Sequence, residues 1–420
     1  MVKGFIIAGT HSGCGKTTLT LGILRTFKNR GIKVQPFKIG PDYIDTSWHK
    51  NASGVDSVNL DLFSMGEEIE AWFWKYAKNS EICVIEGVMG LFDGDFSTFE
   101  VAKRLKFPII LVIDTFGMAE TVYAIVVGFK EILSKEKIEF YLVLNKVSSQ
   151  KHLTRLLNSL KKFKVLGFIP KNIDFEIPSR HLGLYMPGHE GLKEEKLQVL
   201  SEVIEKNIDL TTLLTLKSSK DFSQTKEPKI KFDFKFSSIG IALDSAFCFY
   251  YTHIIDMLKE KYKVKFFSPL KDKNLPDEVS AIYLGGGYPE LYAEILSENS
   301  SMRKNIKTWA EEGLPIYAEC GGLIYLSKEL HFKNKTYPMC EVLPVLASMD
   351  GLHLGYKEIE VLKNTPFFKE KTKFKGHEFH YTKIKELKPI EKVYRIVNQN
   401  GALEGYFYKN VLASYVHFIN

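Results

Sequence analysis

The first half of the chain alternates between short apolar runs and longer segments in which apolar and polar residues mix. The apolar runs are rich in Ile, Val, Leu and Phe and cover 5–8, 34–39, 82–85, 109–113, 140–144 and 165–169. Strands that are apolar on both faces and separated by helical segments are typical of a parallel sheet covered by helices on each side. This half is therefore predicted to be an open α/β domain.

The pattern breaks once and then resumes. Residues 217–236 are mostly polar, charged and aperiodic, which predicts a linker. Apolar runs separated by helical stretches return at 239–243, 264–267, 281–284 and 316–318. We therefore predict two α/β domains, over residues 1–216 and 237–420, a division that suits the length of the chain.

Composition narrows the classes of function. The net charge is +7, but the lysines are spread along the chain and form no cluster with aromatic residues, so a nucleic acid partner is not indicated. The five cysteines include no Cys-x-x-Cys pair, which argues against a disulfide framework or a zinc cluster. No apolar run approaches the roughly 20 residues needed to cross a bilayer, and the first strand is too short and too poor in lysine for a signal peptide. We expect a cytoplasmic protein without a membrane partner, whose charge suits a nucleotide or a polycarboxylate.

A glycine-rich loop follows the first predicted strand. It reads Gly-Thr-His-Ser-Gly-Cys-Gly-Lys-Thr-Thr over residues 9–18 and leads directly into a predicted helix. Backbone N–H groups of such a loop cradle phosphates, the lysine reaches the terminal phosphates, and the following hydroxyl can ligate Mg²⁺. The loop predicts an ATP site that includes Gly13, Gly15, Lys16, Thr17 and Thr18.

Departures from related loops indicate which nucleotide binds. A strict P-loop has glycine at position 10, whereas here Gly9 stands one residue earlier, as in dethiobiotin synthetase-like ATPases. His11 occupies the place of the second signature lysine of partitioning ATPases. Asn145 ends a later strand, but Ser148 stands where GTPases carry the aspartate that reads guanine. We therefore predict adenine rather than guanine, with Asn145 among the ATP-binding residues.

Charged residues follow two strands of the predicted sheet. Asp42 comes after the run at 34–39, and Glu86 and Asp93 come after the run at 82–85. Because ligands bind beyond the carboxyl ends of parallel strands, these carboxylates should flank the same crevice as the phosphate loop. There Asp42 and Glu86, with the Thr17 hydroxyl, can hold Mg²⁺, and Lys38 can neutralise the charge that develops as phosphate is transferred.

Three segments carry a family resemblance. Gly-Thr-x-Ser-Gly-x-Gly-Lys-Thr-Thr, Pro-Phe-Lys-x-Gly-Pro-Asp-Tyr-Ile-Asp and Glu-Gly-Val-Met-Gly-Leu-Phe-Asp-Gly resemble, in order and spacing, the cobyrinic acid a,c-diamide synthase family. The related cobyric acid synthases tend to carry Gln-Asn-Met after the second strand, where this chain has Ile-Gly-Pro-Asp. The resemblance implies that the site for ATP, Mg²⁺ and a corrinoid carboxylate is lined by Asp42, Tyr43, Ile44, Glu86 and Asp93.

A second candidate site lies in the second half. Residues 314–323 form an apolar run, a cysteine, two glycines and a helical stretch, which predicts that Cys320 stands on a strand-to-helix turn. Such a turn exposes a nucleophile, and the dipole of the following helix favours the thiolate. An upstream strand ends in three glycines, and the N–H groups of Gly286 and Gly287 are predicted to form an oxyanion hole. The other four cysteines are interpreted as structural.

A cysteine nucleophile needs a base, and the sequence offers His353, His377, His380 and His417. This half resembles class I glutamine amidotransferases of the cobyrinate and cobyrate synthase type, which implies that His417 activates Cys320. Phe418 and Ile419 replace the common His-Pro-Glu ending, and no third member of a triad can be assigned from the sequence. Residues 376–381 also match these synthases and are interpreted as a structural or interdomain element.

Both resemblances together imply an ATP-dependent amide synthase. ATP would phosphorylate a substrate carboxylate, and ammonia released from glutamine would displace the phosphate. The implied partners are cobyrinic acid or a related tetrapyrrole, ATP and L-glutamine, with Mg²⁺ as cofactor. Hydrogenobyrinic acid and nickel-sirohydrochlorin remain open as substrates, and so does a homodimeric state. A partitioning-type ATPase with an inactive amidotransferase domain is the alternative from another class, which His11 and the intact Cys320 turn disfavour.

Overall fold

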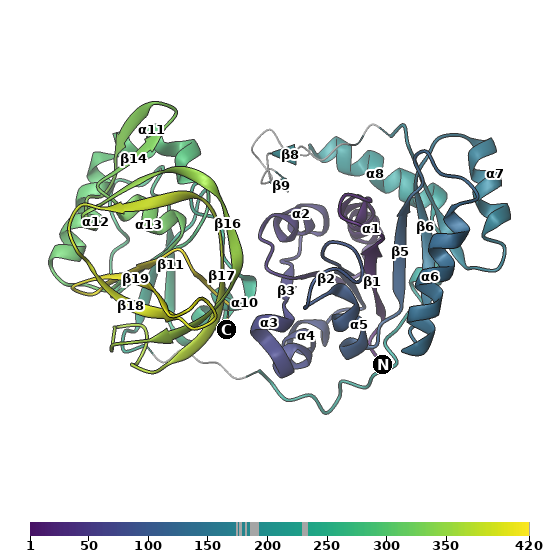
Figure 1. The fold of residues 1–420 in the computed structure, drawn as a ribbon, viewed down its shortest axis with the longest axis horizontal. Coiled ribbons are helices and arrows are strands. Elements are labelled where there is room, and N and C mark those ends of the chain that lie inside the picture. The colour runs from purple at the N-terminus through teal and green to yellow at the C-terminus, as the bar shows by residue number, and fades with distance from the viewer. Residues whose placement is uncertain (174, 176–178, 181–182, 185–192, 229–233, 420) are drawn as a thin grey trace. The chain divides into compact units, whose positions relative to one another are not determined.

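The computed structural model describes residues 1–173, 175, 179–180, 183–184, 193–228 and 234–419. The chain forms two compact units, Met1–Pro228 and Lys229–Asn420, which we call the first and second unit (Figure 1). The division between them falls inside the segment predicted as a linker.

The first unit is built on a parallel sheet with the strand order β3-β2-β4-β1-β5-β6-β7 (Figure 1). Its strands are β1 (Gly4–Gly9), β2 (Val34–Ile39), β3 (Val58–Leu60), β4 (Ile82–Glu86), β5 (Ile109–Asp114), β6 (Phe140–Val147) and β7 (Val165–Pro170), and a separate short pair is formed by β8 (Ser179–Arg180) and β9 (Gly183–Leu184). Each apolar run predicted as a strand in this half is one. The three-residue β3 is too short to leave a periodic signal.

Helices cover both faces of this sheet. They are α1 (Lys16–Asn29), α2 (Ile44–Ser53), α3 (Leu62–Met65), α4 (Ile69–Ala77), α5 (Thr98–Leu105), α6 (Val122–Lys135), α7 (Gln150–Ser159), α8 (Glu194–Asn207) and α9 (Leu210–Leu213), with a 3₁₀ turn at Gly66–Glu68. Phe5 and Ile7 of β1 share a buried core with α1, α2 and α8. On the opposite face Phe37 contacts Phe73 of α4, and the buried Phe222 packs against Phe73. The first part of the predicted linker is therefore packed onto the first unit.

The second unit combines a parallel half with a mostly antiparallel half in one sheet. Its order is β11-β10-β12-β13-β20-β19-β18-β16-β14-β15, with β17 paired to β16 and β21 paired to β17. Its strands are β10 (Ser238–Ala242), β11 (Lys263–Phe267), β12 (Ile282–Leu284), β13 (Ile316–Glu319), β14 (Glu329–Phe332), β15 (Lys335–Pro338), β16 (Val345–Val361), β17 (Lys373–Glu386), β18 (Glu391–Ile396), β19 (Ala402–Tyr408), β20 (Val411–Ser414) and β21 (His417–Phe418). In the sheet order β11-β10-β12-β13-β20, each strand runs parallel to its neighbour. The sequence predicted four of these strands, β10, β11, β12 and β13, which precede Cys320.

The helices of the second unit are α10 (Thr252–Lys261), α11 (Ala293–Glu298), α12 (Ser300–Glu311) and α13 (Gly321–Leu326), with a 3₁₀ turn at Pro289–Tyr292. The core beneath α12 and α13 includes Ile282 and Leu284 of β12 and Ile316 and Ala318 of β13. Among the described residues of both units, no helix is both long enough and apolar enough to cross a membrane.

Candidate active site

The phosphate-binding loop joins β1 to α1. Gly13 and Gly15 have φ angles of 80° and 106°, in a region that residues with side chains rarely adopt. Gly15 also lacks space for a side chain, because a Cβ there would lie 2.1 Å from Nδ2 of Asn145. That amide donates a hydrogen bond to the Cys14 carbonyl at 2.8 Å. Asn145 therefore holds the backbone of the loop, and its contact with the nucleotide stays a prediction.

The start of α1 connects the loop to the end of β4. Lys16 is buried, and its ammonium group donates to the carbonyls of Met89 at 2.5 Å and His11 at 3.3 Å. Burial lowers the pKa of Lys16. The Thr17 hydroxyl donates a hydrogen bond to Oε1 of Glu86 at 2.7 Å. The next residue, Thr18, is half-buried. The structure thus brings the loop and the predicted acid of β4 into direct contact.

Glu86 is the centre of a buried polar cluster. Its side chain is fully buried, Lys38 donates to Oε1 at 3.0 Å, and Nε2 of His49 lies 2.8 Å from Oε2. Burial alone would favour the protonated acid. Lys38, His49 and the Thr17 hydroxyl outweigh burial and hold the pKa of Glu86 well below its usual range.

Lys38 links this carboxylate to a second one. Besides Glu86, its ammonium group contacts Oδ2 of Asp45 at 2.5 Å and the Gly87 carbonyl at 3.1 Å. Burial disfavours the charged amine, but Asp45 and Glu86 outweigh it and raise the pKa of Lys38. Burial and the neighbouring Asp42 raise the pKa of Asp45. All three N–H groups of Lys38 are engaged within the protein, so its action on a phosphate stays a prediction.

The predicted substrate residues on α2 are arranged around the carboxylate of Asp42. Its Oδ1 accepts hydrogen bonds from the N–H groups of Ile44 at 2.8 Å and Asp45 at 2.9 Å, which caps the first turn of α2. Tyr43 is buried and Ile44 is half-buried. Asp42 lies close enough to Lys38 and Asp45 to affect the pKa of both.

The turn after β4 lies against the phosphate loop. The Leu91 N–H donates to the Gly9 carbonyl at 2.8 Å. Asp93 is exposed, and its Oδ2 accepts a hydrogen bond from the Gly90 N–H at 2.8 Å. Asp93 therefore closes a turn at the edge of the loop, which leaves its substrate contact as a prediction.

Cys320 stands between β13 and α13, on the predicted strand-to-helix turn. Its φ and ψ are 46° and −97°, a sparsely populated conformation for a residue with a side chain. Two residues later, the backbone of Gly322 passes so close to β12 that a Cβ on Gly322 would lie 2.3 Å from the Leu284 carbonyl oxygen. The thiol is 4% exposed and lies 3.8 Å from the Phe379 carbonyl oxygen.

The state of this thiol differs from the sequence-based expectation. The helix dipole was expected to favour the thiolate, but α13 is short, and burial together with Glu290 raises the pKa of Cys320. Burial therefore disfavours the thiolate, and a base is needed to remove the proton at the moment of attack.

The glycine strip after β12 adjoins both His417 and the Cys320 turn. His417 is fully buried, and a Cβ on Gly286 would lie 2.3 Å from its Cε1 and 3.2 Å from its Nε2. A Cβ on Gly321 would lie 3.1 Å from the Gly287 nitrogen. The strip thus lies beside the residue after the nucleophile, as an oxyanion hole requires, and the assignment of that role stays a prediction.

Of the other candidate histidines, His377 packs on His417, His380 is buried against Tyr415, and His353 is partly exposed. The His377 ring stacks on the His417 ring with centroids 5.1 Å apart, and its Nδ1 lies 3.1 Å from the Tyr251 hydroxyl. Burial, and then the neighbouring His417, lower the pKa of His377 well below its usual range. His380 stacks on Tyr415 with centroids 3.6 Å apart, and the partly exposed His353 stacks on His380.

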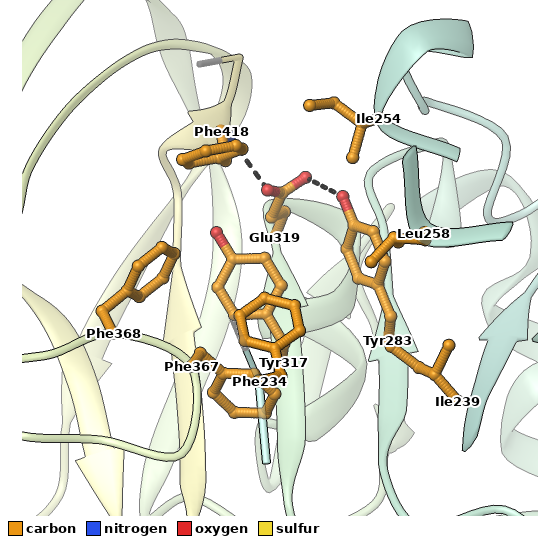
Figure 2. Close-up of a pocket in the computed structure, with 10 residues that line it drawn as sticks. All are labelled: Phe234, Ile239, Ile254, Leu258, Tyr283, Tyr317, Glu319, Phe367, Phe368 and Phe418. Atoms are coloured by element: carbon orange, nitrogen blue, oxygen red, sulfur yellow. Dashed lines mark hydrogen bonds between the residues drawn. The ribbon is translucent and has the colours of Figure 1, made fainter. Parts of the chain in front are cut away.

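His49 and Glu319 belong to these clusters but were not singled out from the sequence. His49 lies on α2 and meets Glu86 only because α2 packs beside β4. Glu319, the residue before Cys320, lies with Oε2 3.6 Å from Nδ1 of His417. Figure 2 shows Glu319 between Tyr283 and Phe418. The sequence carries no signal for either pairing, because both join distant segments.

Comparisons with known proteins agree with this division of chemistry. Residues 5–184 match the model of the CobQ/CobB/MinD/ParA nucleotide binding domain, and residues 238–420 match that of the CobB/CobQ-like glutamine amidotransferase domain. Three similar proteins named cobyrinate a,c-diamide synthase come from Caldanaerobacter subterraneus, Listeria innocua and Saccharolobus solfataricus. They are 40%, 39% and 37% identical, over 99%, 98% and 99% of this chain and 95%, 95% and 97% of their own lengths. At this identity over nearly the full length of both partners, the chain belongs to the cobyrinate a,c-diamide synthase family.

Proposed function

We propose that this protein is an ATP-dependent, glutamine-hydrolysing ligase that converts the a and c carboxylates of cobyrinic acid into carboxamides in cobalamin biosynthesis. The observation that carries the proposal is the union of two sites in one chain. One is a phosphate loop whose Thr17 contacts the buried Glu86, and the other is a thiol on a strained turn, next to a glycine strip that also adjoins the buried His417. The named relatives align with nearly the full length of the chain, which includes both of its matched domains.

The first site activates the acid. A carboxylate oxygen of the substrate attacks the γ-phosphorus of ATP, the bond from that phosphorus to the bridging oxygen breaks, and an acyl phosphate and ADP result. Lys16 and the N–H groups of Gly13 and Gly15 hold the phosphates. Asp42, Tyr43, Ile44 and Asp93 are proposed to position the carboxylate, since α2 and the turn after β4 both lie near the loop.

The residues around Thr17 fit a Mg²⁺ ion. The hydroxyl donates its proton to Glu86, and its oxygen lone pairs can still bind a cation. Among the described residues, no group of three or more His, Cys, Asp or Glu side chains could hold a metal by itself, so phosphate oxygens and water would complete the ligands. Thr17, with Glu86 and Asp42 directly or through water, would hold the ion. When bound, Mg²⁺ neutralises charge on the β- and γ-phosphates.

The second site supplies nitrogen. Sγ of Cys320 attacks the amide carbon of glutamine while His417 takes the thiol proton and passes it to the departing ammonia. The N–H groups of Gly286 and Gly287 stabilise the oxyanion of the tetrahedral intermediate. Water then hydrolyses the thioester to glutamate and frees the thiol.

Joining the two half-reactions gives the product. Ammonia attacks the carbonyl carbon of the acyl phosphate, the carbon–oxygen bond to phosphate breaks, and a carboxamide forms. Ammonia must remain unprotonated until then, because ammonium has no lone pair with which to attack. Two cycles convert two carboxylates and yield two ADP, two phosphates and two glutamates.

The proposal is tested by offering the purified protein ATP, Mg²⁺ and glutamine with cobyrinic acid, hydrogenobyrinic acid or nickel-sirohydrochlorin. Mass spectrometry follows conversion at each carboxylate, and we expect diamidation of cobyrinic acid. Cys320→Ser should lose glutamine-dependent amidation and retain amidation with ammonium chloride. Equal release of glutamate by the wild type and Cys320→Ser would contradict the proposed second site.

A further inference from the structure

The side chain of Glu319 lies directly behind the predicted catalytic base. It ends β13, is 1% exposed and is the residue immediately before Cys320. Its Oε1 accepts a hydrogen bond from the Phe418 N–H at 2.9 Å, and its Oε2 accepts one from the Tyr283 hydroxyl at 2.7 Å (Figure 2). The same Oε2 lies 3.6 Å from Nδ1 of His417. The carboxylate and the imidazole therefore face each other inside the second unit.

Three strands hold this carboxylate in place. Tyr283 comes from β12, which pairs with β13 on one side. Phe418 comes from β21, which β17 holds through the pairing of Gly376 with Phe418. Both oxygens of Glu319 accept from protein donors, as suits an acceptor-only carboxylate. Its orientation toward the imidazole is therefore set by backbone pairing and not by a mobile surface side chain.

The chemistry of the site favours a carboxylate at this point. The Cys320 proton passes to His417 during attack, which creates an imidazolium in a ring that is fully buried. A buried cation is costly unless an opposite charge lies nearby. The ring stacked on His417 belongs to His377, and a histidine ring is either neutral or positive, so it cannot offset the charge of an imidazolium.

Two other carboxylates of this region are engaged elsewhere. Glu378 pairs with the buried Lys357, and Glu404 accepts from Ser414 and from the Tyr415 N–H. Ile419 stands at the position that carries the acid in a His-Pro-Glu ending and contributes no charge. Glu319 approaches the imidazole from β13, the strand that leads to the nucleophile. It therefore offers a carboxylate next to the imidazole, where a His-Pro-Glu ending would place one two residues after the histidine.

We propose that Glu319 is the positioning carboxylate of the glutaminase site, holding the Nδ1–H tautomer of His417 so that Nε2 takes the Cys320 proton. The inference rests on the proposed function and names the missing third member of its catalytic group. The separation of 3.6 Å is too long for a hydrogen bond in the resting site. Such contacts often tighten only when substrate binds and charge develops on the ring.

Glu319→Gln tests the proposal with little change in shape. The glutamine oxygen can still accept from the Phe418 N–H, but the variant carries no negative charge. We expect kcat for glutamine hydrolysis to fall about 10²- to 10⁴-fold, as for other positioning acids, with KM for glutamine unchanged within about twofold. Amidation driven by ammonium chloride should stay at the wild-type rate. Glu298→Gln, which alters an exposed carboxylate at the end of α11, is the matched control.

Glu319→Asp provides the rescue, since its shorter side chain restores the charge at a greater distance from the imidazole and should recover part of the lost kcat. Unchanged glutamine turnover in Glu319→Gln, with an inactive Cys320→Ser, would overturn this inference and leave the proposed function intact. Equal turnover by the wild type and Cys320→Ser would instead overturn the proposed function. These outcomes separate the two claims.

A measurement on the wild type does not depend on the folding of any Glu319 variant. The ¹⁵N spectrum of histidine-labelled protein reports which ring nitrogen carries the proton, and the His417 signals are assigned by their loss in His417→Gln. A proton on Nδ1 with a bare Nε2 supports the proposal. A neutral ring protonated on Nε2 would overturn it.

Discussion

Nε2 of His49 lies 2.8 Å from Oε2 of Glu86, and Nδ1 of the same ring lies 2.9 Å from the Ser57 hydroxyl. The ring therefore orients the carboxylate that Thr17 contacts. We expect His49→Ala to lower kcat for ammonia-dependent amidation roughly 10- to 100-fold, as when the partner of a metal-site residue is removed, and to leave glutamine hydrolysis unchanged. Ser57→Ala keeps the ring and should have a smaller effect. Full amidation activity in His49→Ala would show that Glu86 needs no such support.

Substitution of Lys16 should distinguish the two half-reactions. Its ammonium group reaches over the phosphate loop, so Lys16→Ala should abolish amidation with either nitrogen source while part of the glutamine hydrolysis remains. Parallel assays of carboxamide and glutamate check this. Lys28→Ala, on an exposed position of the same helix, serves as the control. Equal loss of both activities in Lys16→Ala would mean that the two sites do not act separately.

Gly286 has no space for a methyl group. A Cβ there would lie 2.3 Å from Cε1 of His417, so Gly286→Ala must displace the ring. Because a displacement of about 1 Å in a catalytic group can cost about 10²-fold, we expect glutaminase kcat to fall by at least that factor. Ammonia-dependent amidation should persist. Gly351→Ala, where a Cβ meets nothing within 4 Å, should behave as the wild type, and a fully active Gly286→Ala would argue against His417 as the base.

Glu404 makes stability depend on pH in an unusual direction. Burial raises its pKa from 4.5 to about 7, although Ser414 and the Tyr415 N–H donate to it. Between these values the unfolded chain has lost the proton that the folded chain keeps, so this group lowers the free energy of unfolding as pH rises, with the loss complete above about pH 7. Urea unfolding of Glu404→Gln should lack this component. A wild-type minus variant difference that is flat from pH 4.5 to 7 would contradict the assignment.

Two helix glycines should respond to alanine with opposite signs. In α1 a Cβ on Gly22 would lie 2.5 Å from Cγ1 of Ile204 in α8, and overpacking of this kind costs about 1–3 kcal/mol. In α6 the exposed Gly128 has open space, so alanine there should stabilise the helix by about 0.5–1 kcal/mol. Thermal and urea unfolding of both variants measure the difference. Stabilisation by Gly22→Ala would mean that α8 yields to the added methyl group.

Much of the site could be read from the sequence because its parts are local. A phosphate-binding loop needs consecutive N–H groups and glycines, so the residues from Gly13 to Thr17 predicted it without any knowledge of the fold. The strands before it and before Cys320 were predicted because burial on both faces leaves continuous apolar runs. The long β16–β17 pair was not predicted, since its strands are partly exposed and mix polar with apolar residues.

The sequence by itself determined the two chemistries, because a phosphate loop and a cysteine on a glycine turn are each encoded in a few adjacent residues. Only the tertiary structure decided how these groups are charged and oriented. His49 lies next to Glu86, and Glu319 next to His417, although each pair comes from segments that are distant in the chain. The raised pKa of the Cys320 thiol comes first from burial, which is a property of the packed fold and not of adjacent residues in the chain.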